Sequence, residues 1–532
     1  MYPGTHAASA PDRPAVVMAA SGRVLTYGNL DRHSSAIAGA LHRLGLQRGD
    51  VVALLSDNAF EAFEVYWAAM RSGLYITAVN WHLTAEEAAY IVNDCGARVM
   101  FASAGVRALA EQLAAETPAV THRYCFGGTI PGYQLYDALL AEDPIALTEQ
   151  SRGAEMLYSS GTTGRPKGIK PRLSDLPVDE PGDPLISMLQ HGFGISAADR
   201  YLSPAPIYHA APLKWCGGVH ALGGTVVLMD KFDALAALTA IDAYQVTVVQ
   251  VVPTMFIRML QLPDESRLAF DTSSLRLAVH AAAPCPPDVK QAMIDWWGPI
   301  LVEYYGATEG HGSTIISSDQ WLTRPGSVGR AALGVLHICD DEGRDLPHGE
   351  VGLVYFERDD MPFEYHNDPE KTAGSRHPQH QNWCTVGDMG YVDADGYLFL
   401  TDRKAFMIIS GGVNIYPQEI ENVLALHPVI NDVAVIGVPD PQMGEQVKAV
   451  VQLRAGAQGS AKLADELIVF VRERIAHYKA PRTVDFVDEL PRLPTGKLAK
   501  RTLISRYADP DQQHCNTTTY ASFTTTAPTR PS

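Results

Sequence analysis

The chain has 532 residues, which is too long for one ordinary domain, and at roughly 150 residues per domain it predicts three or four units. Its composition is that of a globular protein, with 46% hydrophobic and 19% charged residues. The chain has 42 Lys and Arg against 60 Asp and Glu, so its formal charge is −18. This charge disfavours nucleic acid and anionic membrane surfaces as partners, because both need a basic face.

Targeting and redox signals point to one compartment. No apolar run approaches the ~18 residues that a spanning helix needs, so we expect no membrane span. The first residues carry no basic-then-apolar leader pattern. The seven cysteines are odd in number, widely spaced and without a Cys-x-x-Cys pair, which is typical of reduced thiols. These features predict a cytoplasmic protein.

The first part of the chain alternates helix and strand signals. Apolar residues recur at helical spacing from Leu30 to Leu44, and Gly45 follows as a C-cap. The pattern then predicts a strand over 51–55, a helix over 60–71 that stops at Gly73, and a strand over 75–79. Such alternation indicates parallel sheets covered by helices. The stretch 171–184, rich in proline and acidic residues, predicts an exposed loop.

The last part of the chain predicts a compact α+β arrangement. Asp395-Gly396, between two apolar stretches, indicates a hairpin. Beyond Asp402 a helix is expected from Pro417, a favourable first helical position. Further elements are expected as strands over 433–438, 447–453 and 483–487 and a helix over 463–475. The fold class is therefore α/β, with a large N-terminal region of parallel and mixed sheets covered by helices and a small, mobile α+β C-terminal domain.

The strongest local motif runs from Tyr158 to Gly168, Tyr-Ser-Ser-Gly-Thr-Thr-Gly-Arg-Pro-Lys-Gly. Its glycines let backbone N–H groups approach anionic oxygens, its hydroxyls add donors, and Arg165 and Lys167 add positive charge. These are the parts of a phosphate cradle. The spacing differs from the GxxxxGK[ST] of a P-loop NTPase. A surface turn rich in Gly, Ser and Thr would explain a looser version of the loop, but not these eleven residues together.

This loop resembles the signature of the adenylate-forming superfamily, which comprises acyl- and aryl-CoA synthetases, luciferases and carrier-protein-loading adenylation domains. The resemblance runs from about Thr26 to Arg501, and further motifs follow in the family's order. They are Pro206-Ile207-Tyr208-His209, His280 to Pro284, Tyr304 to Glu309, Val386-Gly387-Asp388, Asp402-Arg403, Ser410 to Pro417, and Pro494-Thr495-Gly496-Lys497. The resemblance implies a large adenylation domain over 1–401, a hinge over 402–406 and a C-terminal lid over 407–508. The Thr-, Pro- and Ser-rich tail over 509–532 is expected to be disordered.

The resemblance implies an acyl-CoA synthetase with ATP, Mg²⁺ and CoA. A carboxylate attacks the α-phosphorus of ATP, giving acyl-AMP and pyrophosphate, and the CoA thiol then takes the acyl group. Because both first partners are anionic, the protein must supply positive charge and alignment. The implied catalytic residues are Lys497, Thr308 and Glu309, with Glu309 also the magnesium ligand. The implied ATP- and AMP-binding residues are Ser159, Ser160, Gly161, Thr162, Thr163, Gly164, Lys167, Ala281, Ala282, Ala283, Tyr305, Gly306, Thr308, Asp388, Arg403 and Lys497.

The acid side is less specific. The implied acyl pocket contains His209, Ala210, Gly217 and Thr254, and a structural role for His209 stays open beside a gating one. Small residues dominate this part of the chain, with no obvious charged group, so we infer a roomy apolar pocket for a fatty or bulky polycyclic acid. Gly411 and Gly412 would line the CoA channel.

The hinge departs from the family pattern. Many members have x-Lys-Asp after Asp402-Arg403, whereas this chain has Lys404-Ala405-Phe406. Either Ala405 replaces the hinge lysine, or the register shifts by one and Lys404 serves. Two rival functions therefore stay open: an adenylating enzyme that passes acyl-AMP to a carrier protein or a separate ligase, and, less in keeping with Lys497 and Glu309, a non-catalytic nucleotide-binding protein. A homodimer is also open.

Overall fold

The computed structural model divides into two compact units, which are described separately. The first unit comprises Met1–Leu336 and Phe356–Val386, and the second comprises His337–Tyr355 and Gly387–Ser532. The structure describes residues 1–141, 150–159, 166–403, 406–411, 413–492, 498–508 and 518–521, with the backbone alone at 403, 508 and 518–521. The hinge expected over 402–406 stays a prediction.

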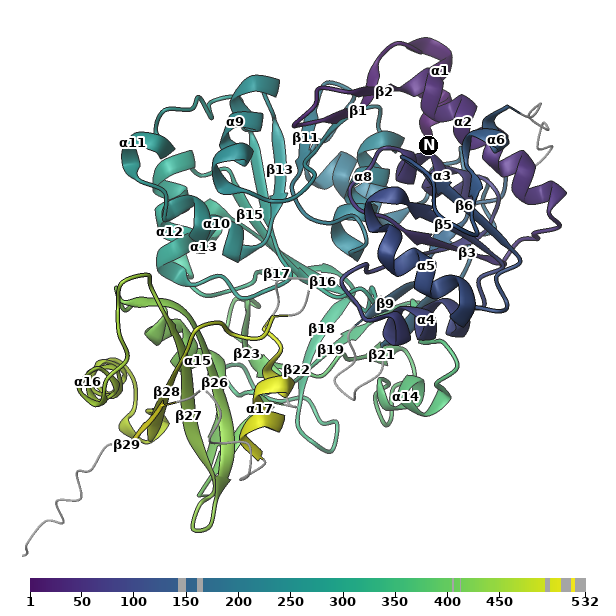
Figure 1. Cartoon of the computed structure of the whole chain (residues 1–532). Coiled ribbons are helices and arrows are strands. Elements are labelled where there is room, and N and C mark those ends of the chain that lie inside the picture. The colour runs from purple at the N-terminus through teal and green to yellow at the C-terminus, as the bar shows by residue number, and fades with distance from the viewer. Residues whose placement is uncertain are drawn as a thin grey trace, which may run out of the picture. The chain divides into compact units, whose positions relative to one another are not determined.

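A nine-stranded sheet forms one half of the first unit (Figure 1). Its order is β17-β16-β15-β14-β13-β11-β12-β1-β2. Strands β1, β12, β11, β13, β14 and β15 run parallel to their neighbours, and antiparallel strands close both edges. The bounds are β1 (Pro14–Met18), β2 (Val24–Thr26), β11 (Arg200–Ser203), β12 (Thr225–Leu228), β13 (Val248–Val251), β14 (Leu277–His280), β15 (Leu301–Gly306), β16 (Ser313–Ser317) and β17 (Arg330–Leu333).

Helices connect the parallel strands of this sheet, as βαβ units require. They are α8 (Ala210–Ala221), α9 (Ala234–Tyr244), α10 (Pro253–Leu260), α11 (Asp264–Arg267) and α12 (Pro287–Trp297). The shorter α13 (Ser318–Thr323) follows β16, and α7 (Pro184–Ser187) precedes β11. The stretch from Arg172 to Asp183, before α7, contains no regular helix or strand, as expected.

A six-stranded parallel sheet, in the order β7-β6-β5-β3-β4-β8, forms the other half of the first unit. Its strands are β3 (Val51–Leu55), β4 (Tyr75–Val79), β5 (Val99–Ser103), β6 (His122–Phe126), β7 (Gln134–Leu135) and β8 (Ala154–Glu155). Its helices include α2 (Tyr27–Arg43), α3 (Glu61–Met70), α4 (Ala85–Asp94), α5 (Arg107–Glu116) and α6 (Asp137–Leu140), and α1 (Pro3–Ser9) packs against α2.

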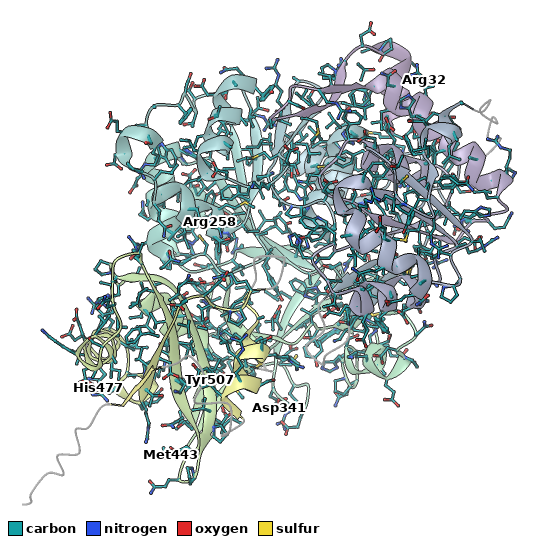
Figure 2. The ribbon with its side chains drawn as sticks, in the orientation of Figure 1. Arg32, Arg258, Asp341, Met443, His477 and Tyr507 are labelled. Carbon is teal, nitrogen blue, oxygen red and sulfur yellow. The ribbon has the colours of Figure 1, made fainter. Side chains whose placement is uncertain are left out.

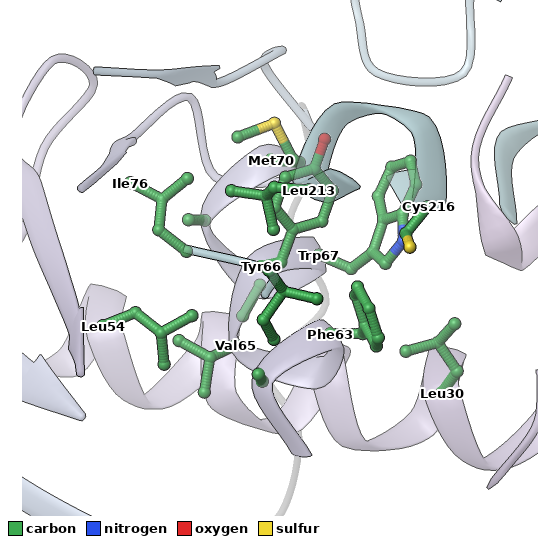
Figure 3. Packing of buried hydrophobic residues seen from close by; sticks show 14 of the residues in the cluster. Leu30, Leu54, Phe63, Val65, Tyr66, Trp67, Met70, Ile76, Leu213 and Cys216 are labelled. Atoms are coloured by element: carbon green, nitrogen blue, oxygen red, sulfur yellow. The ribbon is translucent and has the colours of Figure 1, made fainter. Parts of the chain in front are cut away.

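Helix α3 lies in the middle of the main core. Nine of its ten residues are buried, as expected for a helix that is apolar on nearly every side. Figure 3 shows Phe63, Tyr66 and Trp67 of this helix packed near Leu30 of α2 and Leu213 of α8. Because this core joins elements of both sheets, it fixes α8 against α3.

A small sheet holds the phosphate-loop hairpin. Its order is β20-β10-β9, with β9 (Leu157–Ser159), β10 (Lys167–Pro171) and β20 (Phe363–Tyr365), and both pairings are antiparallel. Residues about 200 positions apart therefore become neighbours. Helix α14 (Pro369–Gly374) follows β20, and β21 (Trp383–Cys384) pairs with the end of β19.

In the residues of the second unit that the structure describes, the chain forms two sheets and three α-helices. One sheet has the order β18-β19-β22-β23, with β18 (Val335–Cys339), β19 (Gly352–Glu357), β22 (Asp388–Val392) and β23 (Leu398–Arg403). The other has the order β25-β24-β27-β28-β29, with β26 also on β27; its strands are β24 (Ile408–Ser410), β25 (Val413–Ile415), β26 (Ile430–Asp440), β27 (Gly444–Leu453), β28 (Thr483–Val487) and β29 (Thr518–Ala521). The helices are α15 (Pro417–Leu424), α16 (Ala461–Arg472) and α17 (Lys500–Ala508). Figure 2 marks this unit by Met443, His477 and Tyr507.

The expected α/β class is confirmed, with parallel sheets and helices in the first unit and α+β structure near the C-terminus. The hairpin at Asp395-Gly396 joins β22 to β23, with Gly396 at φ +80°. Within the tail that we expected to be disordered, Thr518–Ala521 forms β29 on the edge of β28. Threonine is β-branched and suits an edge strand. No helix in the described part of the chain is long and apolar enough to cross a membrane.

Candidate active site

Four parallel strands bring the motifs expected to bind the acid and the nucleotide to one edge of a sheet. Strands β11, β13, β14 and β15 are adjacent and parallel, so their carboxyl ends share an edge. His209 follows β11, Thr254 follows β13, Ala281–Ala283 follow β14, and the segment Tyr305 to Glu309 ends and follows β15. Open α/β sheets bind ligands outside these carboxyl ends. The edge therefore gathers the residues proposed for adenine, phosphate and acid.

The loop proposed for adenine is strained and follows a strand that ends beside a buried ion pair. Ala282 has φ +72°, a left-handed conformation that costs about 1–2 kcal/mol for a residue with a Cβ. Lys290 of α12 is fully buried, and its Nζ lies 2.6 Å from Oε2 of Glu303 in β15. The same Oε2 lies 3.7 Å from Nε2 of His280, the residue that precedes the loop. Burial raises the pKa of the Glu303 carboxyl, and Lys290 opposes that rise. Removing one partner of such a pair costs about 3–5 kcal/mol, so it holds α12 firmly on the sheet.

The segment Tyr305 to Glu309 is held from beneath by aromatic packing. Tyr305 Oη lies 3.5 Å from Nε2 of His311, and the His311 ring meets Phe356 edge-on at 5.1 Å. A Cβ at Gly312 would lie 2.1 Å from the Phe356 ring, so only glycine fits beneath this turn. Arg358 Nη1 donates to the carbonyl oxygen of Gly310 at 2.7 Å. The turn that carries Thr308 and Glu309 is therefore fixed at both ends.

The phosphate loop begins and ends on paired strands. Lys167 and Ser159 are register partners, and so are Gly168 and Tyr158. Of the implied phosphate contacts, Ser160, Gly161, Thr162, Thr163 and Gly164 lie outside the described residues. A Cβ at Gly168 would lie 2.9 Å from Oη of Tyr158, whose hydroxyl donates to Oδ2 of Asp94 at 2.5 Å. Glycine at 168 thus lets the Tyr158 ring cross the hairpin and tie it to α4.

Tyr365 of β20 connects the loop to Glu309. Its hydroxyl donates to Oε1 of Glu309 at 3.0 Å, and the ammonium of Lys167 lies 5.0 Å from the centre of its ring. In the described part of the chain, no group of three or more His, Cys, Asp or Glu side chains could hold a metal ion. Magnesium on a nucleotide needs only one or two carboxylates besides phosphate oxygens, and Glu309 fits that requirement.

His209 lies at the start of α8, beside a row of aromatic rings. The rings of Tyr208 and His209 are 4.3 Å apart, and the hydroxyl of Tyr208 lies 3.2 Å from Nδ1 of His82. Trp81 stacks on His82 at 3.6 Å. Asn58 fixes the same loop, because its Oδ1 accepts from the amide of Ile207 at 2.9 Å and its Nδ2 donates to two carbonyl groups. The sequence motif did not indicate Asn58, Trp81 or His82, which belong to another part of the chain.

The two glycines of α8 pack closely against neighbouring side chains. A Cβ at Gly217 would lie 2.5 Å from Oη of Tyr66, and one at Gly218 would lie 2.3 Å from Leu189. Trp215, 1% exposed, stacks between Phe193 and Tyr201 at 5.6 and 5.8 Å. The step from small residues to a roomy pocket therefore fails at 217 and 218, because nearby side chains already occupy the space. The assignment of Gly217 to the acyl pocket stays a prediction.

The sequence analysis also did not predict a charged cluster near α8. Glu155 accepts from the Tyr66 hydroxyl at 2.8 Å, and its other oxygen lies 3.6 Å from Nζ of Lys214. Lys214 is on α8, three residues before Gly217, so charged groups do occur beside the proposed acid side. The residues around Lys214 in the sequence are mostly apolar, so the sequence did not indicate this ion pair.

In the second unit, the two proposed ribose contacts are register partners. Asp388 opens β22, opposite Arg403 at the end of β23, and it follows Gly387 at φ +87°. The backbone thus places both positions side by side. Asp402 is nearly buried, and its Oδ2 lies 3.8 Å from Nζ of Lys500, which also meets Glu421 at 2.8 Å. Gly411 lies in the turn between β24 and β25. Lys497, Gly412, Lys404 and Ala405 lie outside the described residues.

Comparisons with known proteins agree on the family. Residues 4–365 match the AMP-binding enzyme model, and residues 419–497 match the AMP-binding enzyme C-terminal domain. The chain is 34% identical to a fatty acid–[acyl-carrier-protein] ligase of Streptomyces coeruleorubidus, over 94% of this chain and 95% of that one. It is 31% identical to a long-chain-fatty-acid–CoA ligase of Mycobacterium tuberculosis, over 91% and 93%.

Solved structures of similar proteins cover nearly the whole chain. The amide bond synthetase of Marinactinospora thermotolerans has a TM-score of 0.80 at 28% identity, over 94% of this chain and 98% of that one. ATP-bound MatB of Rhodopseudomonas palustris has a TM-score of 0.80 at 29% identity, over 96% and 99%. With the motifs gathered at one sheet edge and both family models matched in order, the chain belongs to the AMP-binding enzyme family of adenylate-forming ligases.

Proposed function

We propose that this enzyme activates a hydrophobic carboxylic acid with ATP and then passes the acyl group to CoA. In the first step a carboxylate oxygen forms a bond to the α-phosphorus, and the bond from that phosphorus to the bridging oxygen of pyrophosphate breaks. In the second step the thiol of CoA attacks the acyl carbon, loses its proton, and AMP leaves. The products are acyl-CoA, AMP and pyrophosphate.

One observation carries the proposal: the residues proposed for the acid and for the nucleotide meet at the carboxyl ends of four adjacent parallel strands in one sheet. Bringing two anions together needs alignment and positive charge more than it needs a base. Lys167 and Lys497 would supply charge to the phosphates, and Thr308 would donate a hydrogen bond to a phosphate oxygen. Tyr305 and Ala281–Ala283 would hold the adenine, while Asp388 and Arg403 would bind the ribose.

Magnesium fits the site through Glu309, whose carboxylate lies on a fixed turn and is hydrogen-bonded through one oxygen. When bound, the ion neutralises charge on the phosphates. The protein's own contribution is to orient this carboxylate and keep Lys167 nearby.

The acceptor and the acid are the open parts of the reaction. CoA is favoured by the resemblance and by a relative named as a CoA ligase. Transfer to a carrier protein is the alternative, because a relative of similar identity is named as an acyl-carrier-protein ligase. Hydrophobic acids are favoured because α8, which follows His209, is itself largely apolar and buries Leu213 and Trp215 in the main hydrophobic core. His209, Ala210 and Thr254 would line the acid's side of the edge.

The test is a panel of carboxylic acids assayed for ATP–pyrophosphate exchange, followed by thioester formation. Fatty, aryl and polycyclic acids would each be offered without an acceptor, then with CoA, and then with a phosphopantetheinylated carrier protein. Acid-dependent exchange with efficient CoA turnover would support the proposal. Exchange without CoA turnover, but with carrier loading, would support the alternative. Absence of exchange with every acid would refute adenylation.

A further inference from the structure

Tyr365 lies between two side chains of opposite charge that belong to different motifs. Its hydroxyl donates to Oε1 of Glu309 at 3.0 Å. The Nζ of Lys167 lies 5.0 Å from the centre of the same ring, within the range of a cation–π contact. We propose that Tyr365 is a positioning residue that sets the metal-binding carboxylate and the phosphate-binding lysine relative to each other; this rests on the proposed function of both.

The surrounding structure keeps Tyr365 itself in place. Its backbone pairs with Ile169 in the β10–β20 ladder, and its amide donates to Oγ1 of Thr372 at 2.9 Å. The side chain is 7% exposed, and its ring meets Phe363 edge-on at 5.1 Å. A ring held this firmly can orient its neighbours, because it cannot follow them when they move.

The hydrogen bond selects which carboxylate oxygen of Glu309 is presented to a ligand. Oε1 accepts from Tyr365, whereas Oε2 has no hydrogen-bond partner among the described residues. A carboxylate tethered through one oxygen keeps its other oxygen in a fixed direction, so less rotational freedom is lost when a cation binds. Tyr365 would therefore strengthen metal binding without touching the metal.

The ring contact orders the other side of the site. Lys167 stands at the end of the phosphate loop and opens β10, so its long side chain has many rotamers. The negative face of the Tyr365 ring restricts them, and one residue thereby holds both charged groups. The two contacts are separable, because the Glu309 contact needs the hydroxyl and the Lys167 contact needs only the ring.

This separation gives a two-variant experiment. Tyr365→Phe removes the hydroxyl and keeps the ring, and Tyr365→Leu removes both. Mn²⁺ would be titrated into each purified full-length protein with ATP present and no acid, following free Mn²⁺ by its electron paramagnetic resonance signal. Tyr133→Phe is the matched control, since it also removes one tyrosine hydroxyl. The hydroxyl of Tyr133 donates to the backbone carbonyl of Ala110 at 3.0 Å and not to a carboxylate. Melting temperatures would be recorded for all proteins.

We expect Tyr365→Phe to weaken Mn²⁺ binding about tenfold, equivalent to about 1.4 kcal/mol, and to raise the Mg²⁺ requirement of exchange while the KM for the acid stays unchanged. Tyr365→Leu should also weaken ATP binding, and Tyr133→Phe should match wild type. In a Glu309→Gln background the Tyr365→Phe change should have little further effect on Mn²⁺.

Unchanged or tighter Mn²⁺ binding in Tyr365→Phe would overturn the proposal, as would a loss of the same size in the Glu309→Gln background. A wild-type protein that binds Mn²⁺ and ATP but shows no acid-dependent exchange would refute the proposed function instead. The two failures are therefore distinguishable.

Discussion

Replacing Gly217 by alanine tests whether this residue faces an open acyl pocket or a tight contact between helices. A Cβ at this position would lie 2.5 Å from Oη and 2.8 Å from Cζ of Tyr66. Tyr66 is buried on α3, and its hydroxyl donates to Oε1 of Glu155 at 2.8 Å. The new methyl group must therefore displace either helix α8 or the Tyr66 side chain with its hydrogen bond.

The magnitudes favour a clear loss of stability. Overpacking a core costs about 1–3 kcal/mol. Losing a hydrogen bond to a charged acceptor adds about 1.5–3 kcal/mol. Alanine's higher helix propensity offsets about 1 kcal/mol. The free energy of unfolding should therefore fall by about 1.5–5 kcal/mol.

Urea unfolding of the Gly217→Ala protein would measure this loss. Gly374→Ala is the matched control, because Gly374 ends α14 with an ordinary φ, and a Cβ there would meet nothing within 4 Å. The same proteins would be tested for exchange across the acid panel. If Gly217→Ala is as stable as the control and excludes only the bulkier acids, Gly217 faces open space and the packing argument is refuted.

Three further changes test the proposed chemistry and a buried histidine. Lys497→Ala should lower the kcat of exchange by about 10²–10³-fold while ATP binding, followed by calorimetry, persists, because the lysine acts on charge that develops in the transition state; normal exchange would refute its role. Asp388→Ala should raise the KM for ATP more than it lowers kcat, since each lost ribose hydrogen bond is worth about 1.5–3 kcal/mol, and an unchanged KM would contradict the placement of the ribose. His220 is fully buried and accepts from Nε1 of Trp67 at 3.3 Å, and burial lowers its pKa from 6.5 to about 3. As the pH drops below 6.5, the imidazole of His220 is protonated in the unfolded chain before it is protonated in the folded protein. The free energy of unfolding should therefore fall by up to about 1.4 kcal/mol per pH unit between pH 6.5 and 3. His220→Gln should flatten that acid dependence in urea unfolding at pH 7 and 5; an identical slope would show that His220 does not contribute.

The elements predicted best are those whose signal is local. The apolar strands over 51–55, 75–79 and 483–487 match β3, β4 and β28 to the residue, and the helix expected over 60–71 is α3. Each is a short run bounded by turn residues, so neighbouring letters suffice. Strand β26 is longer than the expected 433–438, because its partner β27 extends the ladder to Ile430–Asp440. Pairing partners are not visible in a single run of sequence.

The candidate site divides in the same way. Motif order predicted the family, and alternation of strands and helices predicted parallel sheets. The meeting of His209 and Glu309 at one edge of a sheet was not predicted, because it depends on the order of the strands in that sheet. The role of Tyr365 was not predicted. Tyr365 is 56 residues from Glu309 in the sequence, and it contacts Lys167 only because β20 pairs with β10. The residues around position 365 do not indicate that β20 pairs with β10 in this register.

The acid side leaves the weakest signal in the sequence, and the reason is physical. Nucleotide binding needs particular groups, such as a glycine-rich loop, a carboxylate and a lysine, and these leave signatures in sequence. Pocket volume depends on what fills the space beside each small residue. At Gly217 that space belongs to Tyr66, and at Gly218 to Leu189, residues from two other elements. Small residues in a helix are therefore ambiguous between a cavity and a close helix contact. Because α3 is buried on nearly every side, it leaves α8 little room to move, and acid selectivity should depend on the residues that hold α8 as well as on those that touch the acid.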